Sequence, residues 1–240
     1  IQIKKFYENF IKKVYLSTKI EVAELAKNFE NCQRDLNIAL MNDLYMLCEK
    51  VDINPYEVIN ACETKWNFAN YFPGLVGGHC ISVDPYYLVH KAKTLGYIPE
   101  VILSGRRIND RMGQFIGEKV LKLMEENAIE IKNSNALILG ITFKENMPDI
   151  RNSKVNDIEI LLTQKGVNVD VYDPYANSNE VRDTFNIELS SNLGKYDAII
   201  LAVAHHEFKK LDYSKLKKDK SSIIYDVKGI LEKSLTNGRL

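Results

Sequence analysis

The chain has no excess charge of either sign and no long apolar run. Its 32 lysines and arginines balance 32 aspartates and glutamates, so no net field would draw it to nucleic acid or to an anionic membrane surface. The longest apolar runs, such as residues 196–204, fall far short of the roughly 18 residues that a membrane span needs. We expect a soluble, cytoplasmic protein that binds small molecules, with no nucleic-acid partner and no membrane partner.

Cysteine and histidine are scarce, at four residues each. The cysteines are widely spaced and form no C-x-x-C pair; they are Cys32, Cys48, Cys62 and Cys80. Neither a structural zinc site nor a disulfide framework is therefore favoured, and we predict no bound metal. An initiator methionine is also missing, because the sequence opens at Ile1 and runs directly into an amphipathic pattern. We expect the natural chain to be longer, with a further domain on the N-terminal side.

The most informative feature present is the segment 73–85, Pro-Gly-Leu-Val-Gly-Gly-His-Cys-Ile-Ser-Val-Asp-Pro. Its three glycines let the backbone adopt positive φ and approach a ligand closely, so Cys80 is expected on a presented loop. Asp84 and Pro85 predict the start of a helix, whose positive end would favour a thiolate. His79 suggests a Cys–His hydrolytic dyad as an alternative, although adjacent loop side chains usually point apart.

The first half of the chain has helical periodicity. Apolar spacing predicts a helix over residues 4–16 with a cap at Ser17-Thr18, and then a helix from about Lys19 to Val51 without proline or glycine. A helix of roughly 30 residues would be about 45 Å long, enough for a spine between domains and for a dimer surface. Further helices are predicted over residues 55–62, 85–95 and about 104–127.

From residue 135 the pattern becomes that of an α/β domain. Strands are predicted at residues 136–140, 167–172, 198–203 and 223–227, with a helix at 155–164. This alternation indicates a doubly wound parallel sheet, in which ligands bind beyond the carboxyl ends of the strands. The loop after the first strand and the end of the last, residues 226–229, are therefore the places where a ligand is expected.

Two groups of polar residues are candidates for binding. Lys27, Asn31 and Arg34 share one face of the long helix, which indicates a site only if the Cys80 loop packs over it. Lys144 and Arg151 follow the first strand and suit a diphosphate, because cations and helix N-terminal amides both favour one. No G-x-G-x-x-G or G-x-x-x-x-G-K motif occurs.

Seven ordered blocks resemble the UDP-sugar 6-dehydrogenases over nearly the whole chain. They are residues 23–27, 30–40, 64–68, 73–84, 105–110, 140–153 and 225–229. The Gly-Leu-Val-Gly-Gly-His-Cys and Thr-Lys-Trp-Asn-Phe blocks are most similar to the bacterial branch that acts on UDP-N-acetylhexosamines in capsule and O-antigen synthesis.

The resemblance implies an α/β protein in three parts. Residues 1–16 would be a remnant of an N-terminal NAD-binding domain, residues 17–128 a long-helix all-α dimerisation domain with the catalytic cysteine loop, and residues 129–240 a doubly wound parallel-sheet domain that binds UDP. A homodimer through the long central helix is expected. The family's glycine fingerprint for NAD has no counterpart in the chain.

The resemblance also implies a reaction, the oxidation of the C6 hydroxyl of a UDP-N-acetylhexosamine to a carboxylate with two NAD. Cys80 would form a thiohemiacetal and then a thioester that water cleaves. Lys27 and Asn31 would stabilise the oxyanion, and Asp84 would position or deprotonate the water. Arg151 would reach the NAD pyrophosphate. The expected substrate contacts are Lys144, Arg34, His79 and Lys228.

Alternatives stay open. One is a UDP-glucose or UDP-N-acetylmannosamine 6-dehydrogenase, since one loop does not fix the configuration of the sugar. Another is a UDP-binding and dimerisation module without activity, and a third is the cysteine hydrolase. Asp173 ends the second strand as a ribose-binding acid does, but an Asp-Pro pair there is commonly a turn, so no role is predicted for it.

Overall fold

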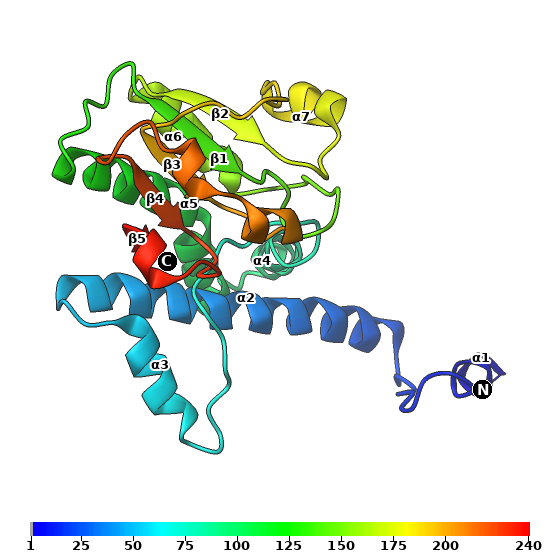
Figure 1. Cartoon of the computed structure of the whole chain (residues 1–240). Helices are drawn as coiled ribbons and strands as arrows, with labels where there is room; N and C mark the ends of the chain where they lie inside the picture. Colours follow the sequence, from blue (N-terminus) through cyan, green and yellow to red (C-terminus); the bar gives the residue numbers. More distant parts are fainter. Residues whose placement is uncertain (1) are drawn as a thin grey trace.

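Two long helices organise the first half of the molecule in the computed structural model, which describes residues 2–240 (Figure 1). The helices of this half are α1 (Gln2–Tyr7), α2 (Ile20–Lys50), α3 (Pro55–Glu63), α4 (Asp84–Thr94) and α5 (Glu100–Glu126). The predicted spine is confirmed as α2, whose N-terminal part extends beyond the rest of the chain toward α1 (Figure 1). Helices α3 and α4 are confirmed, and α5 begins four residues before the predicted start.

The predicted helix over residues 4–16 is wrong in its second half. Only Gln2–Tyr7 is helical, and the chain then runs without regular structure as far as Lys19. Phe6, Phe10 and Tyr15 are all exposed, so no core holds this short amphipathic segment in a helix. Ser17 does not cap α2 either, because its hydroxyl donates to the carbonyl of Lys19.

Helix α5 packs closely on two neighbours through glycines that the sequence pattern left unexplained. A β-carbon at Gly105 would clash with the Leu36 side chain of α2. One at Gly113 would lie 2.6 Å from the β-carbon of Asp157, in helix α6 (Val155–Gln164). The missing side chains therefore let α5 approach both the helical half and the α/β half of the molecule.

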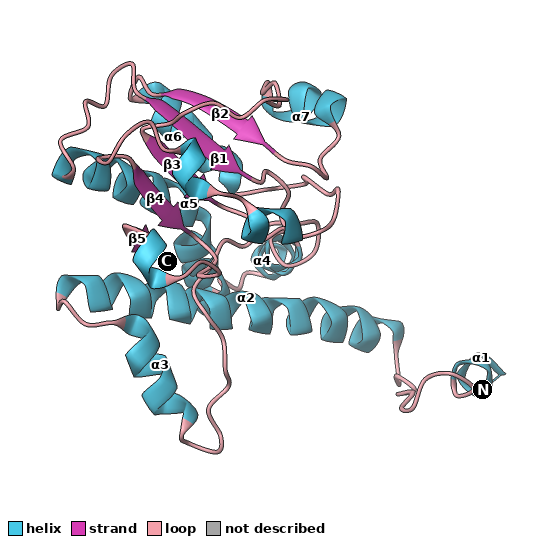
Figure 2. Cartoon of the chain, viewed as in Figure 1, coloured by secondary structure: helices cyan, strands magenta, loops and turns pink. Residues whose placement is uncertain are grey.

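The second half is a sheet of five parallel strands in the order β2-β1-β3-β4-β5 (Figure 2). The strands are β1 (Asn135–Leu139), β2 (Asn168–Tyr172), β3 (Ala198–Leu201), β4 (Ile223–Asp226) and β5 (Gly238–Arg239). The remaining helical segments are α7 (Ser178–Phe185), α8 (Tyr213–Leu216), η1 (His206–Lys210) and η2 (Lys233–Leu235). The doubly wound parallel sheet is confirmed, and the short edge strand β5 was not predicted.

Both faces of the sheet are covered by apolar packing. On one face Ile138 and Ile200 join a core with Ile116 of α5 and Ile158 of α6. On the other face the buried side chains of β1, β3 and β4 pack against Phe208, Tyr213 and Leu216. Because α5 covers the sheet and also contacts α2, it belongs structurally to both halves.

The order of the strands creates a topological switch point at the carboxyl edge of the sheet. From β1 the chain crosses to β2 on one side and returns past β1 to β3 on the other, so the carboxyl ends of β1 and β3 form this switch point.

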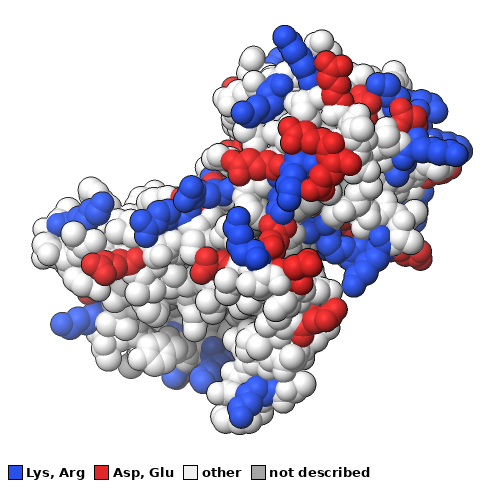
Figure 3. Space-filling view, turned by 90° about the vertical axis from the view of Figure 1, so that its left-hand side faces the viewer, with Lys and Arg blue, Asp and Glu red and all other residues white. Residues whose placement is uncertain are grey.

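Positive and negative side chains are interspersed on the face of the molecule shown in Figure 3. None of the helices within residues 2–240 is both long enough and apolar enough to cross a membrane.

Candidate active site

The loop that carries Cys80 is docked on the α/β half of the molecule. A β-carbon at Gly77 would lie 2.7 Å from the carbonyl oxygen of Asn152, and Gly78 has a φ of +88° with the Phe143 ring directly over it. The N–H of Gly78 donates to the carbonyl of Arg151 at 3.0 Å. Glycine is thus required here both for close approach and for backbone conformation.

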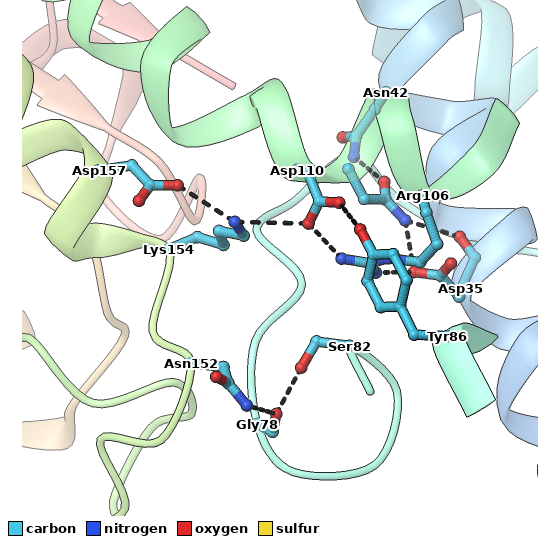
Figure 4. A network of polar contacts seen from close by, with 11 residues as sticks. Asp35, Asn42, Gly78, Ser82, Tyr86, Arg106, Asp110, Asn152, Lys154 and Asp157 are labelled. Atoms are coloured by element: carbon cyan, nitrogen blue, oxygen red, sulfur yellow. Dashed lines mark hydrogen bonds and ion pairs between the residues drawn. The ribbon is translucent and has the colours of Figure 1, made fainter. Parts of the chain in front are cut away.

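The carbonyl of Gly78 is held from two directions, as Figure 4 shows. The side-chain amide of Asn152 donates to it at 2.9 Å, and the buried hydroxyl of Ser82 donates to it from within the loop itself. The loop is therefore fixed to the segment between β1 and α6 by backbone and side-chain hydrogen bonds. This segment also carries Lys144 and Arg151.

Cys80 lies one turn before α4 and is partly exposed. Its carbonyl accepts hydrogen bonds from the N–H groups of Val83 at 3.0 Å and Asp84 at 2.8 Å. Cys80 therefore lies on a partly exposed turn that leads into the N-terminus of α4.

Asn31 and Asp84 are brought together across the two helices that flank this loop. The amide nitrogen of Asn31, a buried residue of α2, lies 2.6 Å from Oδ2 of Asp84. Asp84 is the first residue of α4 and lies only four residues after Cys80. Of the four predicted catalytic residues, Asn31 and Asp84 are thus in direct contact, and Cys80 is joined to Asp84 through its own carbonyl.

Lys27 and Arg34 lie on α2 on either side of Asn31, but in solvent. The ammonium of Lys27 is 3.2 Å from Oε2 of Glu30, and its side chain is 65% exposed. Arg34 forms an ion pair with the same Glu30. Glu30 is a partner that the sequence pattern did not identify, and it holds both cations on the outer side of the helix.

His79 and Arg151 meet at a carboxylate that was not predicted, that of Asp149. Nδ1 of His79 lies 3.7 Å from Oδ2 of Asp149, and Nε of Arg151 donates to Oδ1 at 2.9 Å. The hydrogen bonds from Arg151 hold the pKa of Asp149 below its usual value. The hydrogen bond to Asp149 in turn raises the pKa of Arg151.

No hydrogen bond joins His79 to Cys80 in the part of the chain that the structure describes. The imidazole of His79 faces Asp149 instead. This geometry gives no support to the hydrolytic dyad, because a general base has to reach the thiol that it deprotonates.

Lys144 and Lys228 are both exposed and follow β1 and β4 respectively. Lys228 lines a narrow crevice together with Phe143 and Gly77. It thus approaches the base of the Cys80 loop from the end of the sheet. The two lysines lie at the carboxyl edge of the sheet, where the parallel topology predicts a ligand.

A buried ionic network supports the helices of the site (Figure 4). Arg106 of α5 is 1% exposed, and its guanidinium donates to Oδ1 of Asp35 in α2 at 2.5 Å. A second ion pair joins Arg106 to Asp110, which also accepts from the hydroxyl of Tyr86 in α4 and lies 3.4 Å from the ammonium of Lys154. The network therefore connects α2, α4, α5 and the start of α6.

The network also reaches the first glycine of the loop. The Asn109 amide donates to Oδ1 of Asp35 at 2.7 Å, and the Asn42 amide donates to the Asn109 side chain at 2.8 Å. Asn42 in turn accepts from the N–H of Gly74 at 2.8 Å and donates to its carbonyl at 3.0 Å. Burial raises the pKa of Asp35 despite the opposing charge of Arg106.

A cavity of about 390 Å³ opens beside this network and is lined by Ser82, Tyr86, Arg106, Asp110, Lys154 and Asp157. Its charged residues are already paired with one another, Lys154 lying 3.2 Å from Asp157. The supporting role of these residues was missed by sequence reasoning, although the block 105–110 is part of the resemblance. A charged pattern on a helix does not reveal that the residues are buried.

Comparison with known proteins agrees with this architecture. The model of the central domain of the UDP-glucose/GDP-mannose dehydrogenase family matches residues 21–111, and that of the family's UDP binding domain matches residues 137–233. Protein CapL of Staphylococcus aureus is 47% identical over 93% of the chain, and a UDP-N-acetyl-D-glucosamine 6-dehydrogenase of Salmonella typhi is 46% identical over 94%.

The chain spans about half the length of these relatives, 54% of each. A solved UDP-D-ManNAc dehydrogenase from Pyrococcus horikoshii superposes with a TM-score of 0.82 at 30% identity, covering 99% of this chain and 56% of that one. The central-domain model matches the helical half, which carries the Cys80 loop, and the UDP-binding model matches the α/β half on which this loop is docked. The chain belongs to the UDP-glucose/GDP-mannose dehydrogenase family, of which it contains the central and the UDP-binding domains.

Proposed function

We propose that this protein is the substrate-binding and nucleophile-bearing part of a UDP-N-acetylhexosamine 6-dehydrogenase. The observation that carries the proposal is the Asn31–Asp84 hydrogen bond at the base of a glycine loop that presents Cys80. The greater likeness to the UDP-N-acetyl-D-glucosamine enzyme, 46% against 30% for the UDP-D-ManNAc enzyme, favours the glucosamine branch. The product would serve capsule or O-antigen synthesis.

The nucleophile of the proposed reaction is Cys80. Once the C6 hydroxyl of the sugar has been oxidised to an aldehyde, the thiolate adds to the carbonyl and forms a thiohemiacetal. Oxidation of that adduct gives a thioester, and water then cleaves the C–S bond, releasing the carboxylate and restoring the thiol. Partial exposure on a fixed loop lets the sulfur reach a substrate without rearrangement of the backbone.

Asn31 and Asp84 act on the oxygen atoms at C6. The Asn31 amide is a hydrogen-bond donor directed toward the start of α4, so it serves the oxyanion that forms when Cys80 attacks. The Asp84 carboxylate accepts this hydrogen bond and retains a further oxygen to orient or deprotonate the hydrolytic water. Lys27, one helical turn before Asn31, adds positive charge to the same end of α2.

UDP is proposed to bind at the carboxyl edge of the sheet. Lys144 and Lys228 present two ammonium groups there. Further substrate contacts are proposed for His79, the neighbour of Cys80 in the chain, and for Arg34 on α2. Lysine binds phosphate oxygens as a point charge, which suits a diphosphate that crosses from one loop to another.

NAD is the cofactor implied by the family, and two molecules of it would each accept one of the two hydrides that the oxidation releases. The residue of this chain that fits it is Arg151, an exposed guanidinium whose present partner is the Asp149 carboxylate. A pyrophosphate is a bidentate acceptor of the same kind, so it can take the outer face of Arg151.

Assembly as a homodimer through α2 belongs to the same proposal. Apolar side chains of α2 are exposed along its length, among them Leu25, Phe29, Leu40 and Leu47. A second copy of the helix would cover them. The proposal also divides the chain into a remnant of the NAD-binding domain (residues 1–16), a dimerisation domain (17–128) and a UDP-binding domain (129–240). It places the protein in the cytoplasm, because the four unpaired cysteines of residues 2–240 suit a reducing compartment.

A titration of this chain with UDP, UMP and uridine by calorimetry tests the binding half of the proposal. We expect UDP to bind more tightly than UMP, and uridine to bind weakest, because the two lysines recognise phosphate charge. Lys144→Ala should weaken UDP more than uridine, whereas Lys195→Ala, an exposed lysine before β3, serves as the matched control. Equal affinity for the three ligands would contradict the proposed site.

Turnover is tested with the enzyme that includes the N-terminal part of its relatives. NADH formation is followed with UDP-N-acetylglucosamine, UDP-N-acetylmannosamine, UDP-N-acetylgalactosamine and UDP-glucose. The proposal expects the highest kcat/KM with one of the N-acetylated sugars. A preference for UDP-glucose would select the alternative activity, and UDP binding without turnover would select a binding module.

A further inference from the structure

One carboxylate, that of Asp173, ties together the loops that follow two strands of the sheet. It lies directly after β2, is 6% exposed, and accepts through Oδ2 from the N–H groups of Ile141 at 2.7 Å and Thr142 at 3.1 Å. Through Oδ1 it accepts from the N–H groups of Tyr175 at 2.8 Å and Ala176 at 3.0 Å. With both oxygens engaged inside the protein, Asp173 has no free acceptor for a ribose.

A buried histidine extends this arrangement to the loop after β3. Nε2 of His205 lies 3.1 Å from Oδ2 of Asp173, and its ring stacks on Tyr175 with centroids 4.7 Å apart. Nδ1 accepts from the backbone N–H of Asn146 at 2.8 Å. Since Nδ1 is an acceptor, the ring hydrogen is on Nε2 and points toward Asp173.

The two contacts of His205 bracket Lys144. On one side, the Thr142 hydroxyl lies 3.2 Å from Nε2 of His205 and donates to the carbonyl of Lys144 at 3.0 Å. On the other side, the N–H of Asn146 is bound to Nδ1. Asn146 has a φ of +59°, and its side chain accepts from the N–H of His206, so the turn after Lys144 is attached to the loop after β3.

Burial by itself would raise the pKa of Asp173. The hydrogen bonds from His205 and from the backbone of Ile141 and Tyr175 outweigh it, and they hold this pKa below its usual value. The group at the centre of the arrangement is thus a charged carboxylate whose hydrogen bonds are all internal, which makes it a rigid support.

We propose that His205 and Asp173 are positioning residues that fix the segment 141–146, and with it Lys144, for binding the diphosphate of the nucleotide sugar. This inference rests on the proposed function, because it assigns Lys144 to the substrate. Neither residue touches the ligand. They act through the backbone on either side of Lys144.

The two sides depend on His205 to different degrees. Asp173 binds the N–H groups of Ile141 and Thr142 directly, so the strand side stays anchored without the imidazole. The N–H of Asn146 has only Nδ1 of His205 as its partner in the described structure. Loss of the acceptor at Nδ1 therefore frees the turn after Lys144, whereas loss of the donor at Nε2 does not.

Two substitutions separate these atoms. His205→Asn keeps an acceptor near Nδ1 and loses the group at Nε2, and His205→Gln keeps a donor near Nε2 and loses the acceptor at Nδ1. We expect His205→Gln to raise the UDP dissociation constant of this chain about five- to tenfold and to speed amide exchange at residue 146. His205→Asn should stay within about twofold of the parent in both measurements.

If His205 only filled space, His205→Asn would be the more damaging of the two variants, because the shorter Asn side chain leaves the larger cavity among the buried residues around position 205. Equal effects of the two variants, or parental UDP binding and exchange in His205→Gln, would overturn the proposal. If the parent chain itself does not bind UDP, the proposed function fails, and the exchange at residue 146 still decides whether His205 holds this segment.

A milder pair of variants guards against loss of folding. Thr142→Val removes the hydroxyl that donates to the Lys144 carbonyl and keeps the shape of the side chain, whereas Thr142→Ser keeps the hydroxyl. We expect Thr142→Val to weaken UDP binding about three- to fivefold and Thr142→Ser to restore it to near the parental value. Unchanged binding in Thr142→Val would argue against the inference.

Discussion

The side-chain amide of Asn31 and the carboxylate of Asp84 form a 2.6 Å hydrogen bond across residues 53 positions apart in the sequence. This contact joins the buried face of α2 to the first turn of α4, four residues beyond Cys80. It fixes the distance between the proposed oxyanion donor and the proposed nucleophile loop. The function of the site therefore depends on how rigidly the two helices are held.

Replacement of Cys80 should stop formation of the acid in the enzyme with its N-terminal part. We expect Cys80→Ser to lower uronate production on the order of a thousandfold or more, because the hydroxyl is a far weaker nucleophile at neutral pH. Cys62→Ser, at a second partly exposed cysteine in α3, is the matched control and should retain activity. Product analysis by mass spectrometry checks this, and normal yields of acid from Cys80→Ser would refute the nucleophile.

Removal of the Asn31 amide should affect kcat more than KM. The hydrogen bond serves an oxyanion that exists only during reaction, so Asn31→Ala should reduce kcat by about 100-fold with little change in KM. Asn28→Ala, one turn earlier on the same helix, removes an amide whose only described contact is the Glu24 carbonyl. Steady-state kinetics that show equal losses in both variants would mean that the effect comes from α2 as a whole.

Arg106 should be essential to folding, whereas its neighbour Arg107 should not. Arg106→Met leaves the buried Asp35 without its ionic partner, and we expect the free energy of unfolding to fall by about 3–5 kcal/mol. Arg107→Met, at an exposed position of α5, should change it by no more than about 0.5 kcal/mol. Urea unfolding followed by circular dichroism measures both, and a small loss in Arg106→Met would show that the network tolerates an unpaired carboxylate.

The close approach of α5 to α6 should be sensitive to a single methyl group. Gly113→Ala would place its β-carbon 2.6 Å from the carbonyl of Lys154, so the helices have to separate, at a cost of about 1–3 kcal/mol. Gly74→Ala has open space around the new β-carbon and is the control. Thermal unfolding of the two variants compares them directly, with a lower Tm expected only for Gly113→Ala.

Asp173 should contribute to the acid sensitivity of the fold. Its folded-state pKa is lowered, so the unfolded chain binds more protons, and the stabilisation is present above the unfolded value of about 4 and lost as the pH falls through the folded value. Asp173→Asn should therefore be less stable at pH 7 and lose less stability than the parent between about pH 4 and pH 2. Urea midpoints across this range test it, with Asp183→Asn, an exposed residue of α7, as the control.

The regular elements followed from the sequence because their patterns are local. An uninterrupted 3.6-residue period predicted α2, and Asn54-Pro55 predicted the start of α3, where the Asn54 side chain does accept from the N–H of Tyr56. The segment 4–16 misled the same reasoning, because apolar spacing indicates a helix only where another surface is there to cover it. In the described structure no other part of the chain covers residues 8–16, which are almost all exposed.

The sequence predicted the candidate site residues themselves, but not the side chains that form hydrogen bonds and ion pairs with them. The resemblance identified Cys80, Asn31 and Asp84, and the structure brings Asn31 and Asp84 into contact. Glu30, Asp149 and Asp173 were not predicted, because a carboxylate on a helix or in a turn has the same sequence signature whether it is solvated or bound. Their roles arise from contacts between segments as far apart as β2 and the loop after β3, which no local pattern contains.

Helix α5 has a consequence for any attempt to divide the protein. Its residues Met112, Ile116, Val120 and Met124 are completely buried and form part of the core beneath the sheet. A fragment that starts at residue 129 would lack this helix, and the apolar face of the sheet that α5 covers would be exposed to water. Such a fragment should aggregate, so the nucleotide-binding half has to be produced with α5 attached.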